Sequence, residues 1–298
     1  MIDRTRPDRP LIGIAFLVFG VGLFSLMDAS GKFLVGDYSV FQIVAVRGAV
    51  SVAILAPILF REHGANVLRA NRPVRLILRS ALGVAAMLIF FTGIRYLPLA
   101  DATAIGFSGA IFMTAFSAIF LHEKVEWQRW AAIIVGFAGA LVVAQPGTET
   151  FHWAGLLMLL CAFLYAGMMT MTRVLARTES NATMVFYHSV FSTFVGLVAL
   201  PFVWVTPGWN EWMLMICMGV LATAGHMIFA QAFREAPVSV LAPFEYTALV
   251  WASLLGFFVW GDVPGPNVWL GSIILIFAGL YILYRETRRQ PTVSPSNP

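Results

Sequence analysis

Two titratable side chains, Glu245 and His226, lie well inside long apolar runs of this 298-residue chain. Glu245 follows Pro237 by eight residues, and His226 precedes Arg234 by eight residues in the preceding apolar run. At about 1.5 Å per helical residue, both side chains would lie about 12 Å from the same end of two neighbouring helices. A carboxyl group and an imidazole at one level are a candidate site for substrate or protons, the alternative being a structural hydrogen bond between helices.

Arg47 is a third charged side chain inside an apolar run, seven residues from its start. A guanidinium at that depth needs an anion, and Asp28 and Asp101 are expected at a comparable level. A structural ion pair and a contact with substrate both remain open for Arg47. Asp28 can also pair with Lys32, four residues later on the same helix, and Asp101 can cap the N-terminus of its helix.

The remaining candidates are weaker. Gln231 and Tyr246 lie close in sequence to the acid and imidazole described above, and Tyr165 lies in the middle of another run, where it can contact a ligand or simply pack. Glu123 and Asp262 follow apolar runs and are expected to anchor helix ends or loops. The His and Cys residues do not have the spacing of a metal site, and the sequence has no Gly-rich loop that would bind the phosphates of a nucleotide. We therefore predict no metal and no other cofactor.

The amino-acid composition indicates which kind of structural element must hold these side chains. Of the residues, 59% are hydrophobic and only 11% are charged, and the mean hydropathy is +0.82, whereas soluble domains carry about 25% charged residues. Apolar runs of about 20 residues can cross a bilayer as helices, and no run alternates with a period of two. We therefore expect an all-α membrane protein with ten transmembrane helices, near residues 11–30, 40–60, 76–95, 99–121, 129–146, 153–172, 183–205, 212–233, 238–260 and 267–284.

The basic residues predict an orientation. With the N-terminus inside the cell, fifteen Lys and Arg residues fall on the cytoplasmic side, and only Lys32 and Arg95 fall outside. Cytoplasmic loops of membrane proteins carry such an excess. Residues 1–10 and the tail 285–298 are therefore both predicted to be cytoplasmic, with the chain in the inner membrane. The net charge of +4 is explained by this orientation, and no basic stripe indicates nucleic acid.

Charged residues, prolines and tryptophans near the ends of the apolar runs recur with a constant offset of 139 residues. The repeated pairs are Arg95 and Arg234, Pro98 and Pro237, Glu123 and Asp262, and Trp130 and Trp269. Each half would hold five spans, in residues 11–144 and 153–284. Since five is odd, the second half must cross the membrane in the opposite sense to the first, which is the arrangement of transporters that alternate between two open states.

Several segments resemble the EamA domain, the repeat unit of the drug/metabolite transporter superfamily. In the first half these are Arg47, residues 96–104, Glu123 and the small-residue segment 136–139; in the second they are residues 236–245 and 261–262. The second half has Asp262 where the family often has Glu, and the first has Ser108 and Gly109 where a mid-span proline is common. The resemblance implies transport of a small amphipathic metabolite, such as an amino acid, nucleoside, vitamin or drug, with export favoured. The segment at 96–104 also resembles importers of S-adenosylmethionine or riboflavin.

Together these patterns predict a secondary transporter rather than an enzyme. Protons are a candidate coupling ion, and both a monomer and a homodimer are compatible with the sequence. A remote alternative is an intramembrane serine protease, because Gly106-Phe-Ser108-Gly109 resembles its nucleophile motif and His188 or His226 could act as the base. A channel or scaffold is a further alternative.

Overall fold

The computed structural model describes residues 9–64, 70–120, 127–144, 152–175, 178–236, 241 and 244–287, and every long element within them is a helix. Glu123, Pro237 and most of the link between the predicted halves lie outside these residues. The helices are α1 (Pro10–Leu34), α2 (Val40–His63), α3 (Pro73–Ile94), α4 (Leu99–Gly106), α5 (Ser108–Phe120), α6 (Trp127–Ala144), α7 (Ala154–Leu175), α8 (Asn181–Val203), α9 (Trp209–Glu235), α11 (Thr247–Trp260) and α12 (Pro266–Thr287).

The starts of several helices follow from local sequence. Pro10 and Pro73 begin α1 and α3, where proline's missing N–H costs nothing because the first turn has no acceptor for it. Ser39 and Ser180 precede α2 and α8, and their hydroxyl groups accept hydrogen bonds from backbone N–H groups of the first turn. These four residues fix where the first-half and second-half helices begin.

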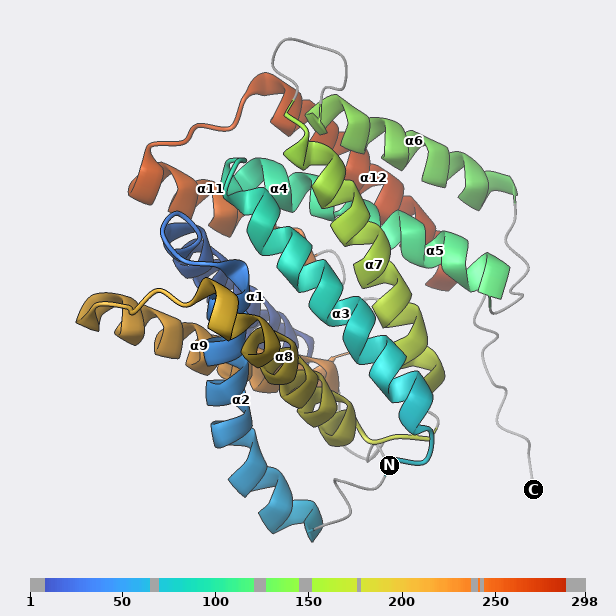
Figure 1. The fold of residues 1–298 in the computed structure, drawn as a ribbon. Helices are drawn as coiled ribbons and strands as arrows, with labels where there is room; N and C mark the ends of the chain where they lie inside the picture. The colour runs from blue at the N-terminus through green and yellow to red at the C-terminus, as the bar shows by residue number, and fades with distance from the viewer. Residues whose placement is uncertain are drawn as a thin grey trace, which may run out of the picture.

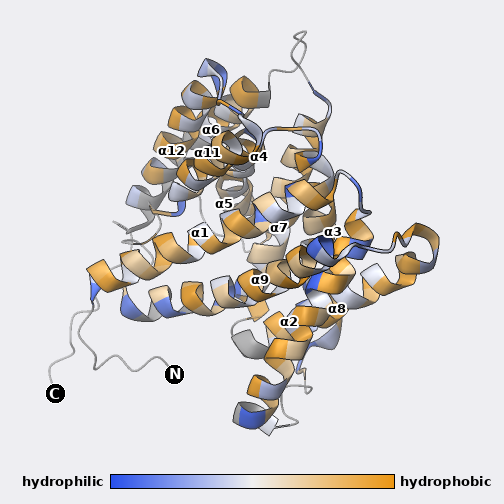
Figure 2. Cartoon of the chain, turned by 90° about the vertical axis from the view of Figure 1, so that its left-hand side faces the viewer, coloured by the Kyte–Doolittle hydropathy of each residue, from blue (hydrophilic) through white to orange (hydrophobic). Residues whose placement is uncertain are grey.

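Seven helices among the described residues are long and apolar enough to cross a membrane. They correspond to seven of the ten predicted spans. Shorter apolar helices, at Ile134–Val143, Thr247–Trp260 and Pro266–Ala278, lie within the other three, so the count of ten stays a prediction. Figure 2 shows hydrophobic residues along most helices and hydrophilic residues mainly toward helix ends and connections.

Outward-facing side chains are large and apolar. Phe202, Phe258 and Trp209 are 87%, 77% and 79% exposed. In water, such a surface would favour aggregation; in a bilayer, it contacts lipid.

The helices pack mainly in four pairs, which join segments far apart in the sequence. α1 lies against α9, α2 against α8, α3 against α7 and α6 against α12. In Figure 1, α3 and α7 run side by side through the centre, and α6 lies beside α12. α2 also contacts α9, and α3 contacts α8, so that α2, α8 and α9 meet inside the bundle.

Small residues permit these close approaches. A Cβ atom on Gly271 of α12 would lie 2.6 Å from the carbonyl oxygen of Gly139 on α6. A Cβ atom on Gly196 of α8 would lie 2.6 Å from that of Ala45 on α2. Because lipid and side chains are equally apolar, helices in membranes associate largely through this kind of close packing.

The fourth predicted span is interrupted. α4 ends at Gly106 and α5 begins at Ser108, with Phe107 between them in a helical conformation whose N–H contacts three carbonyls of the preceding turn. The sequence predicted one helix through this region. The break instead falls where the family resemblance places a mid-span proline, although here the residues are Ser and Gly.

Polar contacts tie the helices together at one end of the bundle. The amide of the fully buried Gln42 donates to the carbonyl of Val205 at 2.7 Å and accepts from its N–H at 3.0 Å. Arg95 donates to the carbonyl of Gly36 at 3.2 Å. These contacts group the ends of α1, α2, α3 and α8, which the charge pattern assigns to a single membrane face.

Candidate functional site

Arg47 lies inside the bundle and has no direct ion pair. One guanidinium nitrogen, Nη1, contacts Sδ of Met87 on α3, while Nε is buried without a hydrogen-bond partner. Asp28 on α1 is near enough for its charge to act on Arg47, but the pair is not among the ion pairs within 4.0 Å that join described residues. The expected contact with Asp28 or Asp101 is therefore not formed, and Asp28 acts only from a greater distance.

Arg47 lines a cavity of about 150 Å³ between α2, α8 and α9. The polar side chains on its wall are Arg47 and Ser51 of α2, His188, Ser189 and Ser192 of α8, and Thr223 and His226 of α9. Arg47 and Ser51 are four positions apart and Thr223 and His226 three, and Ser192 follows Ser189 and His188 by three and four, spacings that bring side chains together on a helix surface. Residues from both predicted halves thus enclose the cavity.

Close packing of α2 against α8 positions this wall. A Cβ atom on Gly48 would lie 2.6 Å from Oγ1 of Thr193 and 3.2 Å from Oγ of Ser192. Only a residue without a side chain allows the helices to approach this closely at the level of Arg47. Gly48 therefore brings the hydroxyl group of Ser192 close to α2 at the position that follows Arg47 in sequence.

The hydroxyl groups shared by α2 and α9 are satisfied. Oγ1 of Thr223 donates to the carbonyl of Gly219 at 2.8 Å and lies 3.3 Å from Oγ of Ser51. A Cβ atom on Gly219 would lie 2.6 Å from Cβ of Val50, so glycine is needed for this approach too. Ser51 and Thr223 thus serve the packing of α2 on α9.

Other polar atoms of the cavity residues have no partner. Arg47 Nε, His188 Nδ1 and Ser192 Oγ are all buried without a hydrogen bond, and Ser192 is only 2% exposed. The His188 ring lies against α3, where a Cβ on Gly83 would be 3.2 Å from Nδ1. An unsatisfied buried polar group costs about 1–3 kcal/mol, and more when charged. A cluster of such groups around a cavity is a reason to expect a polar ligand there.

His226 belongs to this group rather than to Glu245. Its Nδ1 lies 2.6 Å from the carbonyl of Ala222, and its ring meets Phe24 of α1 edge to face, with centroids 4.9 Å apart. His226 and His188 both line the cavity. Within the described part of the chain, no hydrogen bond or ion pair joins His226 to Glu245. The predicted acid–imidazole contact is therefore not formed.

Glu245 lies with two tyrosines at a different place in the bundle. Its carboxylate, just before α11, is exposed, and its charge acts on Tyr165 of α7 and on the neighbouring Tyr246. The Tyr246 ring meets Phe107, at the break between α4 and α5, edge to face with centroids 4.9 Å apart. Glu245, Tyr165 and Tyr246 are not among the residues that line the cavity at Arg47.

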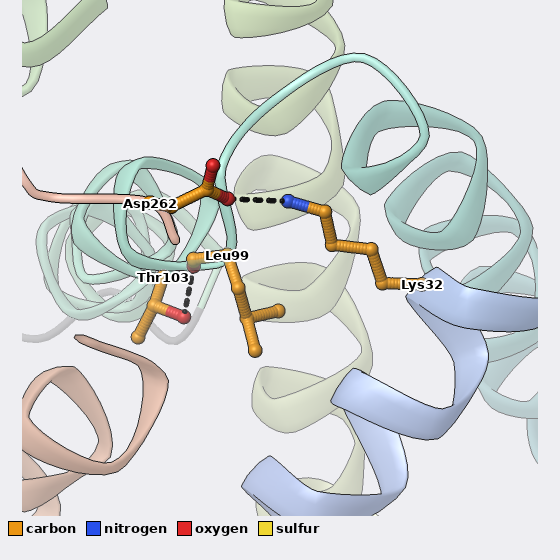
Figure 3. Close-up of polar contacts among 4 residues, drawn as sticks. All are labelled: Lys32, Leu99, Thr103 and Asp262. Atoms are coloured by element: carbon orange, nitrogen blue, oxygen red, sulfur yellow. Dashed lines mark hydrogen bonds and ion pairs between the residues drawn. The ribbon is translucent and has the colours of Figure 1, made fainter. Parts of the chain in front are cut away.

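Another polar group joins α1 to the residues that follow α11 (Figure 3). Nζ of Lys32, on α1, lies 3.1 Å from Oδ2 of Asp262 and 4.8 Å from the ring centroid of Trp260. Gly261 adopts a left-handed conformation, with φ of 73°, that ends α11 and turns Asp262 toward α1. The alternative pairing of Lys32 with Asp28 is therefore wrong, while Asp262 anchors a helix end as expected. Asp101 lies near enough for both charges to act on it.

Two further candidates have local environments of their own. Gln231 donates to the carboxylate of Glu235 on the same helix at 2.9 Å. Ser108 is fully buried, and its hydroxyl makes no hydrogen bond to any described residue, including His188 and His226. The nucleophile–base contact of a serine protease is therefore not formed here. Asp101 lies in the first turn of α4, where a carboxylate interacts favourably with the N-terminal end of the helix dipole.

The sequence did not identify the whole cavity. His188 was considered only as a protease base, and Ser51, Ser189, Ser192 and Thr223 were not selected. A signal was present, because Arg47 with Ser51 and His188 with Ser192 are each four residues apart inside apolar runs. Such spacing predicts a polar stripe on each helix, but not that the two stripes face one another.

An apolar helical bundle that encloses a polar cavity defines a multi-pass membrane protein that handles a small molecule. The chain belongs to the EamA-like transporter family, whose sequence profile matches residues 11–145 and 152–285. This identifies the chain as a membrane transporter of the drug/metabolite type. The named relatives described below come from bacteria. The expected family is thus confirmed.

Named relatives align along nearly the whole chain. An S-adenosylmethionine uptake transporter of Rickettsia felis is 29% identical over 278 residues, covering 93% of this chain and 94% of the relative. A riboflavin transporter of Vibrio cholerae is 28% identical, covering 94% and 95%. A pseudopaline exporter of Pseudomonas aeruginosa is 27% identical, covering 89% and 94%.

A solved crystal structure shares the fold. It superimposes with a TM-score of 0.63 at 17% identity and covers 94% of this chain and 98% of the other. At this identity the likeness concerns the fold alone.

Proposed function

We propose that this protein is a ten-span secondary transporter of the inner membrane that carries a small amphipathic metabolite by alternating access. Its two halves, residues 11–144 and 153–284, are proposed to be inverted five-helix repeats with both chain termini in the cytoplasm. The observation that carries this proposal is the polar cavity between α2, α8 and α9, since its wall combines residues of both halves.

The helix pairings support the repeat. In two such repeats, each helix of the first half has a counterpart in the second: α7 for α1, α8 for α2, α9 for α3 and α12 for α6. A two-fold rotation that exchanges the halves then converts the α1–α9 pair into the α7–α3 pair. The α2–α8 and α6–α12 pairs turn into themselves, and the α2–α9 pair turns into the α8–α3 pair. All of these pairings occur. A two-fold relation between the halves accounts for them with one rule, as it does in transporters built from repeats.

The direction of transport has two candidates. Export is the direction that the family resemblance favours, and one relative is named a pseudopaline exporter. Uptake is favoured by the names of the S-adenosylmethionine uptake transporters, which are 27–29% identical to this chain. Alternating access allows both, because the direction depends on the substrate gradient and on any coupled ion.

Counterflow in proteoliposomes tests the proposal without assuming a direction. Vesicles containing purified protein are loaded with an unlabelled candidate substrate, and entry of the labelled compound from outside is followed. We expect labelled S-adenosylmethionine, riboflavin, an amino acid or a nucleoside to accumulate transiently. Vesicles without protein are the control. Failure of every one of these compounds to exchange, in protein shown to be folded, would contradict the proposal.

A further inference from the structure

The wall of the cavity is unbalanced in charge. Among the described residues that line it, Arg47 is a permanent cation, His188 and His226 are imidazoles, and the other polar groups are hydroxyls. None of these lining residues is a carboxylate. Asp28 acts on Arg47 from outside this set and forms no direct ion pair with it.

The unpaired atoms are donors or can become donors. Arg47 Nε carries a hydrogen that has no acceptor, and the Ser192 hydroxyl, almost fully buried, has none either. His188 lies one turn before Ser192 on α8, and its Nδ1 is also unpaired. Gly48 holds Ser192 against α2 at the level of Arg47, since a Cβ there would be 3.2 Å from the Ser192 oxygen. Two helices from different halves thus carry unpaired polar atoms on residues that line one cavity.

We propose that this cavity binds a carboxylate group of the transported metabolite, with Arg47 as the charged partner and Ser192 and His188 as neutral partners. A carboxylate supplies two acceptor oxygens, which the planar guanidinium fork matches. The inference rests on the proposed transport function and adds the chemical class of the substrate. It also assigns binding roles to Ser192, which was not selected from the sequence, and to His188, which was considered only as a protease base.

The size of the cavity agrees with a group rather than a whole molecule. Pockets that enclose complete drug-sized ligands measure about 300–1,000 Å³, whereas this cavity measures about 150 Å³. A carboxylate with its adjoining carbon atoms fits such a space, and the rest of the metabolite must extend beyond it. A phosphate monoester carries about 1.5–2 negative charges at neutral pH, which one permanent cation on the wall balances less well than a single carboxylate.

The test uses pairs of compounds that differ only in the carboxylate. Purified full-length protein in lipid nanodiscs is titrated with S-adenosylmethionine and decarboxylated S-adenosylmethionine, methionine and its amide, and tryptophan and tryptamine, with riboflavin and phenyl phosphate as further probes. Binding is followed by the shift in thermal unfolding. At least one acid should bind about tenfold or more tightly than its partner without the carboxylate, as expected for hydrogen bonds to a charged group.

Variants test whether the preference for the acid depends on residues that line the cavity. Arg47→Gln should abolish the preference for the acid, and Ser192→Ala should reduce it about threefold to tenfold. Ser272→Ala is the matched control, because Ser272 is also a buried serine with an unpaired hydroxyl but lies on α12 and does not line the cavity. If Arg47→Gln does not fold, Ser192→Ala still decides.

Each outcome has a defined meaning. Equal binding of both members of every pair, tighter binding of phenyl phosphate than of every acid, or a preference unchanged in Ser192→Ala and Arg47→Gln would overturn the inference. Binding of riboflavin or of the amines without any acid would also overturn it, while leaving the transport function intact. No binding of any probe, together with no counterflow, would count against the proposed function as well.

Discussion

The ion pair between Lys32 and Asp262 predicts how the transporter divides its time between conformations. It joins α1, in the first half, to the end of α11, in the second. Alternating access requires the two halves to separate at one face and close at the other. Replacing Lys32 by Met keeps most of the side-chain volume and removes the charge, and should therefore favour the state in which this end is open.

The structure sets the size of the effect. The Lys32 and Asp262 side chains are 12% and 30% exposed, so the pair is partly shielded from water. Exposed ion pairs contribute about 0.2–1 kcal/mol, and the contact of Lys32 with Trp260 adds about 0.5–1 kcal/mol. A total of about 1–2 kcal/mol would change the ratio of closed to open states by about 5- to 30-fold.

Distances between spin labels can measure this ratio. Labels attached at Asp37 and Val263, which are exposed in the connections after α1 and α11, report the separation of the two halves at this end. The native Cys161 and Cys217 are first replaced by Ser. Pulsed electron paramagnetic resonance should show mainly the short distance in the parent chain. In the Lys32→Met variant, a longer distance should gain population.

The double variant decides whether the pair itself is responsible. Asp262→Asn should have a smaller effect than Lys32→Met, because it leaves the contact of Lys32 with Trp260 in place. Adding Asp262→Asn to Lys32→Met should change little more, because Lys32→Met has already removed the ion pair. The charge exchange Lys32→Asp with Asp262→Lys should restore part of the short distance. Additive effects of the two single changes, or an unchanged distance distribution in both, would refute the role assigned to the ion pair.

Three further predictions follow from other contacts. Glu245→Gln should abolish transport or remove its dependence on pH between about 5 and 8 if the carboxylate carries a coupled proton, as measured by counterflow in buffered vesicles; an unchanged pH profile would exclude that role. Gly271→Ala should lower the free energy of unfolding by about 1–3 kcal/mol, because the new Cβ would lie 2.6 Å from the backbone oxygen of Gly139. Gly106→Ala is the control, because no atom lies within 4 Å of its Cβ, and it should not lower the stability. Gln42→Leu should cost about 1–3 kcal/mol of unfolding free energy, since it removes both hydrogen bonds between the buried Gln42 side chain and the backbone of Val205; equal melting temperatures would contradict this.

Much of the architecture could be predicted from the sequence because membrane helices depend on local composition. A run of about 20 apolar residues must be helical in lipid whatever its neighbours are, since its backbone has no other hydrogen-bond partners. The described helices therefore begin and end near the predicted limits. The break at Phe107 was missed, because neither flanking residue is a proline and a short local turn leaves no mark in hydropathy.

The candidate site could be predicted only in part, because facing surfaces depend on packing. Arg47 and His226 were identified from their depth, and both line the cavity. The partner expected for His226 was wrong, since depth along a helix does not specify the direction in which a side chain points. Likewise, Lys32 pairs with a residue 230 positions away rather than with Asp28 four positions away, because the left-handed Gly261 turns Asp262 toward it.

The proposed repeat explains why the cavity lies where it does. A helix that packs against the equivalent helix of the other repeat must lie nearest to the two-fold axis. The α2–α8 and α6–α12 pairs are of this kind. The second pair meets through small and apolar residues such as Gly139 and Gly271, which leaves no room for a ligand. The first pair carries Arg47 on one helix and His188 on the other, 141 positions apart and close to the repeat offset of 139. The two halves thus contribute Arg47 and His188 at nearly equivalent positions, so the carboxylate proposed above would lie off the axis, nearer to the permanent cation. In the proposed alternating access, Arg47 would move with the first half and Ser192 with the second. A ligand held by both would therefore contact the two bodies whose relative motion carries it across the membrane.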